Sequence, residues 1–205
     1  MPKDKSASRV KINAAMKAEF LEKGFAGASI RAIGERAGMT SAALYKHYNS
    51  KEDMFRAAVE PLINALRERM EQHTRRKYIL TENGSDVDVL FGETFTDIVR
   101  EVILPHRDEF LLLMNCSQGT KYENFLHDYA EENGIALEDV IRFMKERGYP
   151  AKDLEKEELH MLLSAYLTAV FEPIVHGLSD EKVVKYLARV NDFFMPGWKN
   201  ILGAS

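Results

Sequence analysis

The sequence contains a single cysteine, Cys116, among 205 residues. One thiol cannot form an internal disulfide or supply the several thiolates of a zinc cluster, and scarce cysteine is typical of a reducing compartment. Because Cys116 follows an apolar run, we interpret it as a small buried side chain, with redox sensing as the alternative. The six histidines are scattered and show no metal-ligand spacing, so we expect no metal site and no cofactor.

Long apolar runs and catalytic motifs are also missing. No run reaches the 18 residues of a membrane span, and the first residues lack the apolar stretch of a signal peptide. We therefore expect a cytoplasmic protein with no membrane partner. Without a glycine-rich phosphate loop or a Gly-x-Ser-x-Gly elbow, an enzyme is not indicated. Alternating strand patterns do not occur either, and helical periodicity throughout predicts an all-α fold.

Positive charge is concentrated at the start of the chain. The formal net charge of −4 alone argues against a nucleic-acid-binding protein. Residues 1–50, however, hold nine Lys or Arg against four acidic residues, which gives +5 and leaves −9 for the remainder. Since the Debye length is only about 8 Å at physiological salt, a basic lobe attracts phosphates whatever lies far from it. A solvated surface of mixed charge is the alternative interpretation.

Residues 28–52 have the pattern of two short helices, a tight turn between them and the start of a third helix. Ser29 suits the cap of the first helix, and Gly38 suits its end, because glycine readily adopts the left-handed backbone of a sharp helix exit. The second helix can then begin at Thr40. Two short helices joined steeply by a turn with glycine form a helix-turn-helix unit, whose second helix enters the major groove of DNA.

The second helix has one packing side and one side suited to DNA. Ala43, Leu44 and Tyr48 fall where they would pack against the first helix. The other side carries Ser41, Ala42, Tyr45, Lys46 and His47. Small side chains allow a close approach to base edges, and the later hydroxyl, ammonium and imidazole groups can donate to phosphate oxygens.

Three segments of this region resemble the DNA-binding signature of the TetR (tetracycline-repressor) family of bacterial regulators. They are Ala37-Gly38-Met39-Thr40, Leu44-Tyr45-Lys46-His47-Tyr48 and Ser50-Lys51-Glu52. The resemblance runs from Arg9 to Met54, about a quarter of the chain. One departure is Ala42, where the family often has Gly or Pro, which affects the bases that are read more than the fold.

The resemblance and the helix pattern together give a set of DNA-binding candidates. The set is Ser29, Thr40, Ser41, Ala42, Ala43, Tyr45, Lys46, His47 and Lys51. We expect Tyr45, His47 and Lys51 to contact phosphates, and Ser41, Ala42 and Lys46 to lie nearer the bases. The expected domains are a helix-turn-helix domain at residues 1–52 and a helical ligand-binding and dimerisation domain at residues 53–205.

The remaining helices are expected as follows. A first helix ends at Gly24 with Phe25 plugging a small core, and a long helix begins at a Ser50/Asp53 capping box and is kinked by Pro61. A turn is expected at 83–86, and helices at about 87–104, 106–116, 122–133 and 137–147, with a break at Gly134.

The last fifty residues predict two helices that are apolar on more than one face. The first ends near His176, and the second begins at Asp180. A hairpin with two apolar faces needs its own domain on one side and a partner on the other, and a second copy of the chain is the simplest partner. The TetR resemblance implies the same homodimer. The predicted interface residues are Leu163, Leu167, Val170, Leu187, Val190 and Phe194.

The middle of the chain is rich in aromatic residues and methionine, which suit an apolar ligand cavity between helices or, alternatively, a plain core. The predicted ligand-binding residues are Phe91, Phe95, Phe110, Met114, Tyr122, Phe125, Tyr129, Tyr166, Phe171 and Glu172. The sequence thus predicts a homodimeric transcriptional repressor that binds an inverted-repeat operator in double-stranded DNA and is released by a small apolar or amphipathic effector. The alternative is a helical adaptor or scaffold that dimerises through its last two helices.

Overall fold

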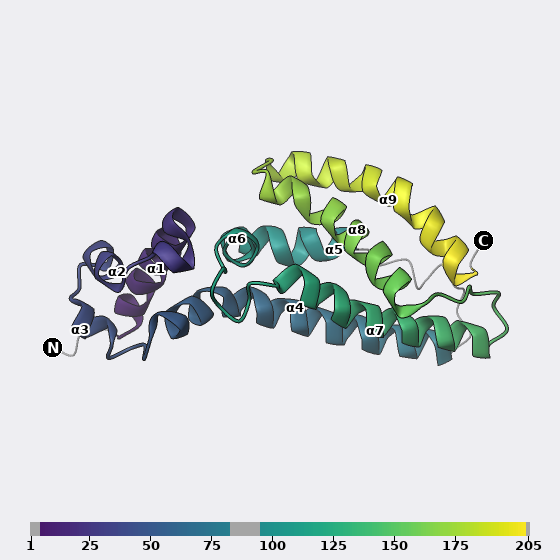
Figure 1. Cartoon of the computed structure of the whole chain (residues 1–205), viewed down its shortest axis with the longest axis horizontal. Coiled ribbons are helices and arrows are strands. Elements are labelled where there is room, and N and C mark those ends of the chain that lie inside the picture. The colour runs from purple at the N-terminus through teal and green to yellow at the C-terminus, as the bar shows by residue number, and fades with distance from the viewer. Residues whose placement is uncertain (1–4, 83–94, 204–205) are drawn as a thin grey trace. The chain divides into compact units, whose positions relative to one another are not determined.

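The computed structural model describes the backbone of residues 5–82 and 95–203, and the side chains of residues 8–72 and 96–203. Within these ranges the regular structure is entirely helical, which confirms the all-α prediction (Figure 1). The α-helices are α1 (Lys5–Gly27), α2 (Ile30–Ala37), α3 (Ser41–Leu44), α4 (Lys51–Glu82), α5 (Phe95–Ile98), α6 (Arg107–Asn115), α7 (Phe125–Glu146), α8 (Lys156–Val175) and α9 (Asp180–Leu202).

The chain forms two compact units. The first comprises residues 1–65 and 106–123, and the second comprises residues 66–105 and 124–205. Helix α6 therefore packs in the same unit as α1, α2 and α3, although it lies far from them in the sequence. The predicted domain of residues 53–205 contains α6, because helical periodicity does not reveal which helix covers an apolar face.

A cluster of aromatic rings fills the core of the first unit. The α-helical conformation of α1 is interrupted at Gly24, which has φ 66° and ψ 169°, where the sequence predicted the end of the first helix. Phe25 then turns inward, and its ring lies 6.2 Å from that of Phe20 and 5.5 Å from that of Phe55. The backbone N–H of Phe25 donates to the carbonyl of Cys116 at 2.8 Å, which fixes the residue after α6 to the end of α1, just beyond the interruption at Gly24.

Helix α4 begins with a side-chain cap at Ser50. The backbone N–H of Asp53 donates to Ser50 Oγ at 3.1 Å, as the predicted capping box requires. The Asp53 carboxylate, however, accepts from the backbone N–H of Asn49, one residue before the position expected, and this bond lowers the pKa of Asp53. The helix continues through Pro61, whose predicted kink stays a prediction.

The segment between α4 and α6 is only partly described. The turn predicted at 83–86 and the beginning of the helix expected after it lie outside the described residues. Instead of one uniform helix up to Pro105, the described part contains α5, a π-helical turn at Val99–Ile103 and a 3-10 turn at Leu104–His106.

Helix α7 is continuous, so the predicted break at Gly134 is wrong. The helix buries Tyr129 and Ala130 before this glycine and Ile141 and Met144 after it. A glycine costs a helix only about 1 kcal/mol relative to alanine, and the burial of side chains on both sides outweighs that cost.

Helices α8 and α9 end and begin as predicted, at His176 and Asp180. By length and composition α8 is apolar enough to span a membrane, and it packs against α7 and α9. Five predicted interface residues are buried within the single chain: Leu163, Leu167, Val170, Leu187 and Val190. Their assignment to a dimer interface is therefore corrected to the core of the second unit, and Phe194 alone of the six remains partly exposed.

Candidate nucleic-acid interface

Helix α2 is capped at both ends by the residues that the sequence indicated. Ser29 Oγ accepts from the backbone N–H of Ala32 at 3.2 Å. At the other end Gly38 has φ 67° and ψ 33°, its N–H donates to the carbonyl of Glu35, and the N–H of Met39 donates to that of Gly34. This is the Schellman arrangement, which ends the helix sharply and turns the chain toward α3.

Gly34 allows the turn between α2 and α3 to pack closely on α2. A Cβ atom at this position would lie 2.8 Å from the carbonyl oxygen of Met39 and 3.5 Å from the nitrogen of Ser41. Both neighbours are backbone atoms, which cannot rotate away as the end of a side chain can. Gly34 is absent from the residues predicted from the sequence, because nothing in the local pattern shows a close backbone approach.

Helix α3 is short and is followed by further turns. Thr40 Oγ1 accepts from the backbone N–H of Ala43 at 3.2 Å, which caps its start. Leu44 and Tyr48 are buried, as predicted, and the Tyr48 hydroxyl donates to Asn13 Oδ1 on α1 at 3.0 Å. The burial of the Tyr48 phenol raises its pKa, so it is neutral at physiological pH. These contacts attach α3 to α1.

The predicted second helix reaches Tyr48, but α3 ends at Leu44, and most of the DNA-binding candidates lie exposed on α3 and on the turn that follows it. Ala42, Tyr45, Lys46 and His47 are exposed, and Ser41 and Ala43 are half-buried. Tyr45 is 51% exposed, which is high for so large an apolar ring. Ser29 and Thr40 are exposed too, but each uses its hydroxyl oxygen to cap a helix. Small side chains at the start of this segment, followed by hydroxyl, ammonium and imidazole groups, form the kind of surface that is expected to contact base edges in a DNA groove.

Lys51 has a structural partner set that the sequence did not reveal. Its Nζ donates to the carbonyl oxygens of Ala26 at 3.3 Å and Ala28 at 3.2 Å, and lies 4.6 Å from the centre of the Phe25 ring. An ammonium group has three N–H donors, so one remains for a phosphate. Lys51 thus links the start of α4 to the end of α1. Its contact with a DNA phosphate stays a prediction.

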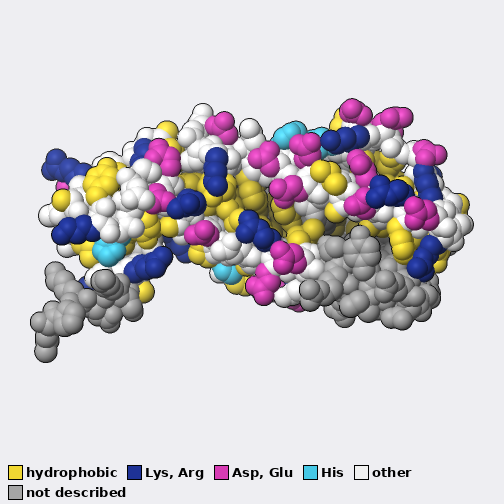
Figure 2. Space-filling view, turned by 90° about the horizontal axis from the view of Figure 1, so that it is seen from below, with side chains coloured by type: hydrophobic (Ala, Val, Ile, Leu, Met, Phe, Trp, Pro, Cys, Tyr) yellow, Lys and Arg dark blue, Asp and Glu magenta, His cyan; other side chains and the backbone are white. Residues whose placement is uncertain are grey.

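Ion pairs within the first unit neutralise much of its basic charge. Lys17 pairs with Glu109 at 2.5 Å, Lys23 with Glu22 at 2.9 Å and Arg31 with Glu35 at 3.0 Å. Figure 2 likewise shows basic and acidic side chains interspersed across the face in view. Among the described side chains of residues 8–50, Arg9, Lys11 and Lys46 form no ion pair. Positive charge without an acidic partner is therefore confined to fewer side chains than the composition suggests.

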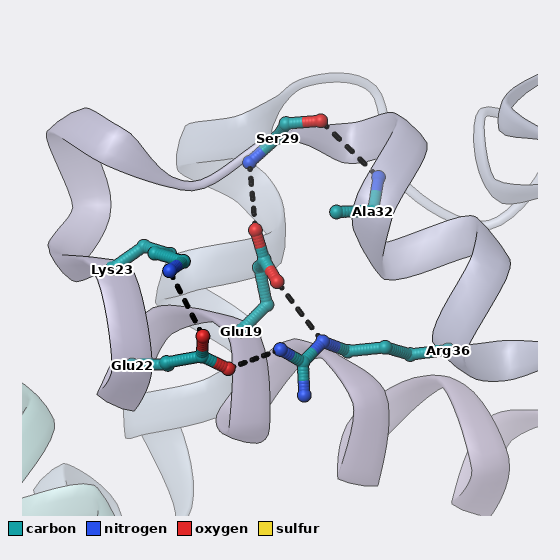
Figure 3. A network of polar contacts seen from close by, with 6 residues as sticks. All are labelled: Glu19, Glu22, Lys23, Ser29, Ala32 and Arg36. Atoms are coloured by element: carbon teal, nitrogen blue, oxygen red, sulfur yellow. Dashed lines mark hydrogen bonds and ion pairs between the residues drawn. The ribbon is translucent and has the colours of Figure 1, made fainter.

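A buried carboxylate joins α1 to α2 (Figure 3). Glu19 is 3% exposed, accepts from the backbone N–H of Ser29 at 3.3 Å through Oε1, and accepts from Arg36 Nε at 3.0 Å through Oε2. Arg36 also donates to Glu22, and hydrogen bonds from Lys23 and Arg36 lower the pKa of Glu22. One guanidinium therefore binds two carboxylates of α1.

The structure does not bring the ten predicted ligand-binding residues into one group. Phe91 lies outside the described residues, as does the side chain of Phe95. Three others belong to the first unit, namely Phe110, Met114 and Tyr122. In the second unit the centre of the Tyr129 ring lies 5.8 Å from that of Phe125 and 6.3 Å from that of Phe171. The Tyr166 ring contacts those of Phe194 and Trp198. Glu172 is exposed and bonds His176 at 3.2 Å, away from this cluster.

Comparisons with known proteins agree with this geometry. Residues 12–58 match the family model described as bacterial regulatory proteins, tetR family. Two solved structures of NalD, the secondary repressor of the MexAB-OprM multidrug efflux pump in Pseudomonas aeruginosa, match with 20% identity over 96% of this chain and 97% of theirs. Their TM-scores are 0.56 and 0.50, which shows a shared fold. No curated protein sequence matches the chain. The matched segment covers α2, the Gly38 turn and α3, so this part of the chain is similar to the helix-turn-helix DNA-binding domain of tetR-family regulators.

Proposed function

We propose that the chain is a homodimeric transcriptional repressor that binds an inverted-repeat operator and is released from it by a small apolar or amphipathic effector. The observation that carries the proposal is the exposed surface of α3 and of the turn after it, where Ala42, Tyr45, Lys46 and His47 follow a sharply capped turn. The NalD structures of the same fold belong to a repressor, and we extend that role to this chain. A protein acting on chromosomal DNA works in the cytoplasm.

The homodimer is supported by the apolar residues that α8 and α9 leave exposed. These helices carry five of the eight large hydrophobic residues that are exposed among the described side chains: Met161, Leu162, Val184, Tyr186 and Phe193. Phe193 is 78% exposed. An exposed apolar surface of this kind is costly in water and is typical of a protein interface. Twofold pairing would place two α3 helices about 34–36 Å apart, on successive major grooves.

The effector site is proposed in the second unit, at the aromatic cluster of Phe125, Tyr129 and Phe171. These residues come from α7 and α8, and burial strongly raises the pKa of the Tyr129 phenol, so the cluster is apolar and uncharged. A small apolar or amphipathic molecule is the chemical class that such a surface would bind. An effector that favours one arrangement of the dimer changes DNA affinity by its differential affinity for the two states, typically about 1–3 kcal/mol.

The full chain should be tested by selection from random duplex DNA, followed by sedimentation of the free protein and its complex. We expect enrichment of inverted repeats with half-sites about one helical turn apart, and a dimer at micromolar concentration. Removal of one half-site should abolish tight binding. Failure to enrich any sequence would refute the DNA-binding role, and a helical adaptor that dimerises through α8 and α9 would then be the better interpretation.

A further inference from the structure

Glu19 is an unusual residue for the interior of a small helical unit. Only four polar or charged residues are buried in the described part of the chain, and Glu19 is the least exposed of the glutamates. A buried carboxylate is costly unless it is paired and hydrogen-bonded. Here both oxygens have partners, and both partners belong to α2: the backbone N–H of Ser29 and the guanidinium of Arg36 (Figure 3).

The two bonds are placed at opposite ends of α2. Ser29 is the N-cap residue of this eight-residue helix, and Arg36 lies in its last turn. Because one carboxylate holds both ends, α2 can neither slide along α1 nor rotate about its own axis without breaking one of the bonds. The Schellman turn at Gly38 and the backbone contact at Gly34 make α3 follow α2 closely. Glu19 thus holds α2 against α1, and through α2 it contributes to the orientation of α3, together with the hydrogen bond from Tyr48 to Asn13.

We propose that the Glu19–Arg36 pair positions α3 for sequence recognition and that Arg36 is a positioning residue with no phosphate contact of its own. This inference rests on the proposed DNA-binding function. A buried ion pair often adds little to stability compared with apolar residues of the same volume, but it restricts the arrangements that the surrounding helices can adopt. Glu19 binds the Nε of Arg36 and Glu22 binds its Nη2, so both acidic partners hold the guanidinium against α1.

The Glu19→Gln variant separates positioning from electrostatics, because the two predict opposite changes in the affinity for the selected operator. An amide has one acceptor oxygen, so it cannot satisfy both the Ser29 N–H and the Arg36 Nε–H. The substitution also makes the unit more positive, and electrostatics alone predicts tighter binding to every DNA. Positioning predicts the opposite for the selected operator, with affinity about tenfold weaker, while binding to random DNA is unchanged or stronger.

Glu35→Gln is the matched control. It changes the charge equally, on α2 itself, and breaks only the exposed pair with Arg31 at 3.0 Å. This variant should show the electrostatic effect without loss of operator preference. The Arg36→Met variant should lower operator affinity and leave the slope of log K against log salt unchanged. A phosphate contact would instead flatten that slope by about 0.9 for each half of a dimer.

The double variant Glu19→Leu with Arg36→Met keeps the proposal testable if Glu19→Gln fails to fold. Replacing the pair with apolar side chains should restore the wild-type melting temperature, but not the operator preference. Recovery of both properties would overturn the proposal, because the pair would then only fill space. Operator binding by Glu19→Gln as tight as that by Glu35→Gln would overturn it too. If the wild-type chain selects no DNA at all, it is the proposed function that fails.

Discussion

Replacing Gly34 with alanine tests whether the turn between α2 and α3 is as closely packed as the structure indicates. The added Cβ would meet the Met39 carbonyl oxygen at 2.8 Å, closer than the 3.0 Å below which real Cβ contacts essentially never occur. Since the obstacle is backbone, α2 and the turn must separate. Overpacking of this kind costs about 1–3 kcal/mol, whereas the change from glycine to alanine inside a helix returns up to about 1 kcal/mol.

The expected net loss is therefore about 1 kcal/mol, with a range of about 0–3, and about 1 kcal/mol lowers the melting temperature of a chain of this size by roughly 2–4 °C. Gly27→Ala is the matched control. Its Cβ would lie 3.6 Å from that of Lys23, an ordinary contact, so the helix gain should appear without the clash. Thermal unfolding of both variants gives the comparison, and operator affinity should fall only for Gly34→Ala. If Gly34→Ala were as stable as Gly27→Ala and bound DNA as tightly as wild type, the close packing would be wrong.

Three further outcomes are expected. Phe193→Glu should give a folded monomer by sedimentation, because this side chain is exposed, whereas Leu187→Glu should unfold the second unit, since Leu187 is fully buried; a folded, monomeric Leu187→Glu would contradict this. Lys51→Met should lower the free energy of unfolding by about 1–2 kcal/mol through its lost carbonyl bonds and flatten the salt dependence of DNA binding by about 0.9 per half of the dimer, while Lys46→Met should leave stability unchanged and alter base preference; the reverse pattern would exchange their roles. Burial raises the pKa of Tyr129 above its ordinary value of 10.0, so its contribution to stability is complete below pH 10 and is lost as pH rises, when the unfolded chain releases this proton first. Chemical unfolding between pH 9 and about 11 should show a smaller loss for Tyr129→Phe than for wild type, and equal losses would refute the assignment.

The elements with local chemical signals were predictable from the sequence. The Ser29 cap, the Gly38 exit, the Thr40 cap and the start of α9 each depend on a side chain and the backbone within a few residues. The TetR signature added the candidates for DNA contact on the second helix, which stay predictions. Such features need no knowledge of distant parts of the chain.

Features set by long-range packing were not predictable. Helical spacing marks Leu163 and Leu187 as apolar but cannot say whether their partner is the same chain or a second copy, and the structure buries both within one chain. The same limit hid the pairing of Lys17 with Glu109 across 92 residues. Glu19 and Arg36 were counted as charges at a surface, because nothing in a one-dimensional pattern places a carboxylate beneath the two ends of a helix.

The central claim, that α3 lies in the major groove of two successive half-sites, is tested most directly by cleavage from a reagent attached to α3. Ala42 is exposed, and Cys116 is buried with its pKa raised by burial, so an Ala42→Cys variant offers one accessible thiol for a tethered iron chelate. Ala136→Cys, at an exposed position on α7, is the control. The account predicts cleavage of the selected DNA in two major-groove patches about 34–36 Å apart for Ala42→Cys and none for Ala136→Cys. Cleavage confined to the minor groove, or the same cleavage from both positions, would contradict it.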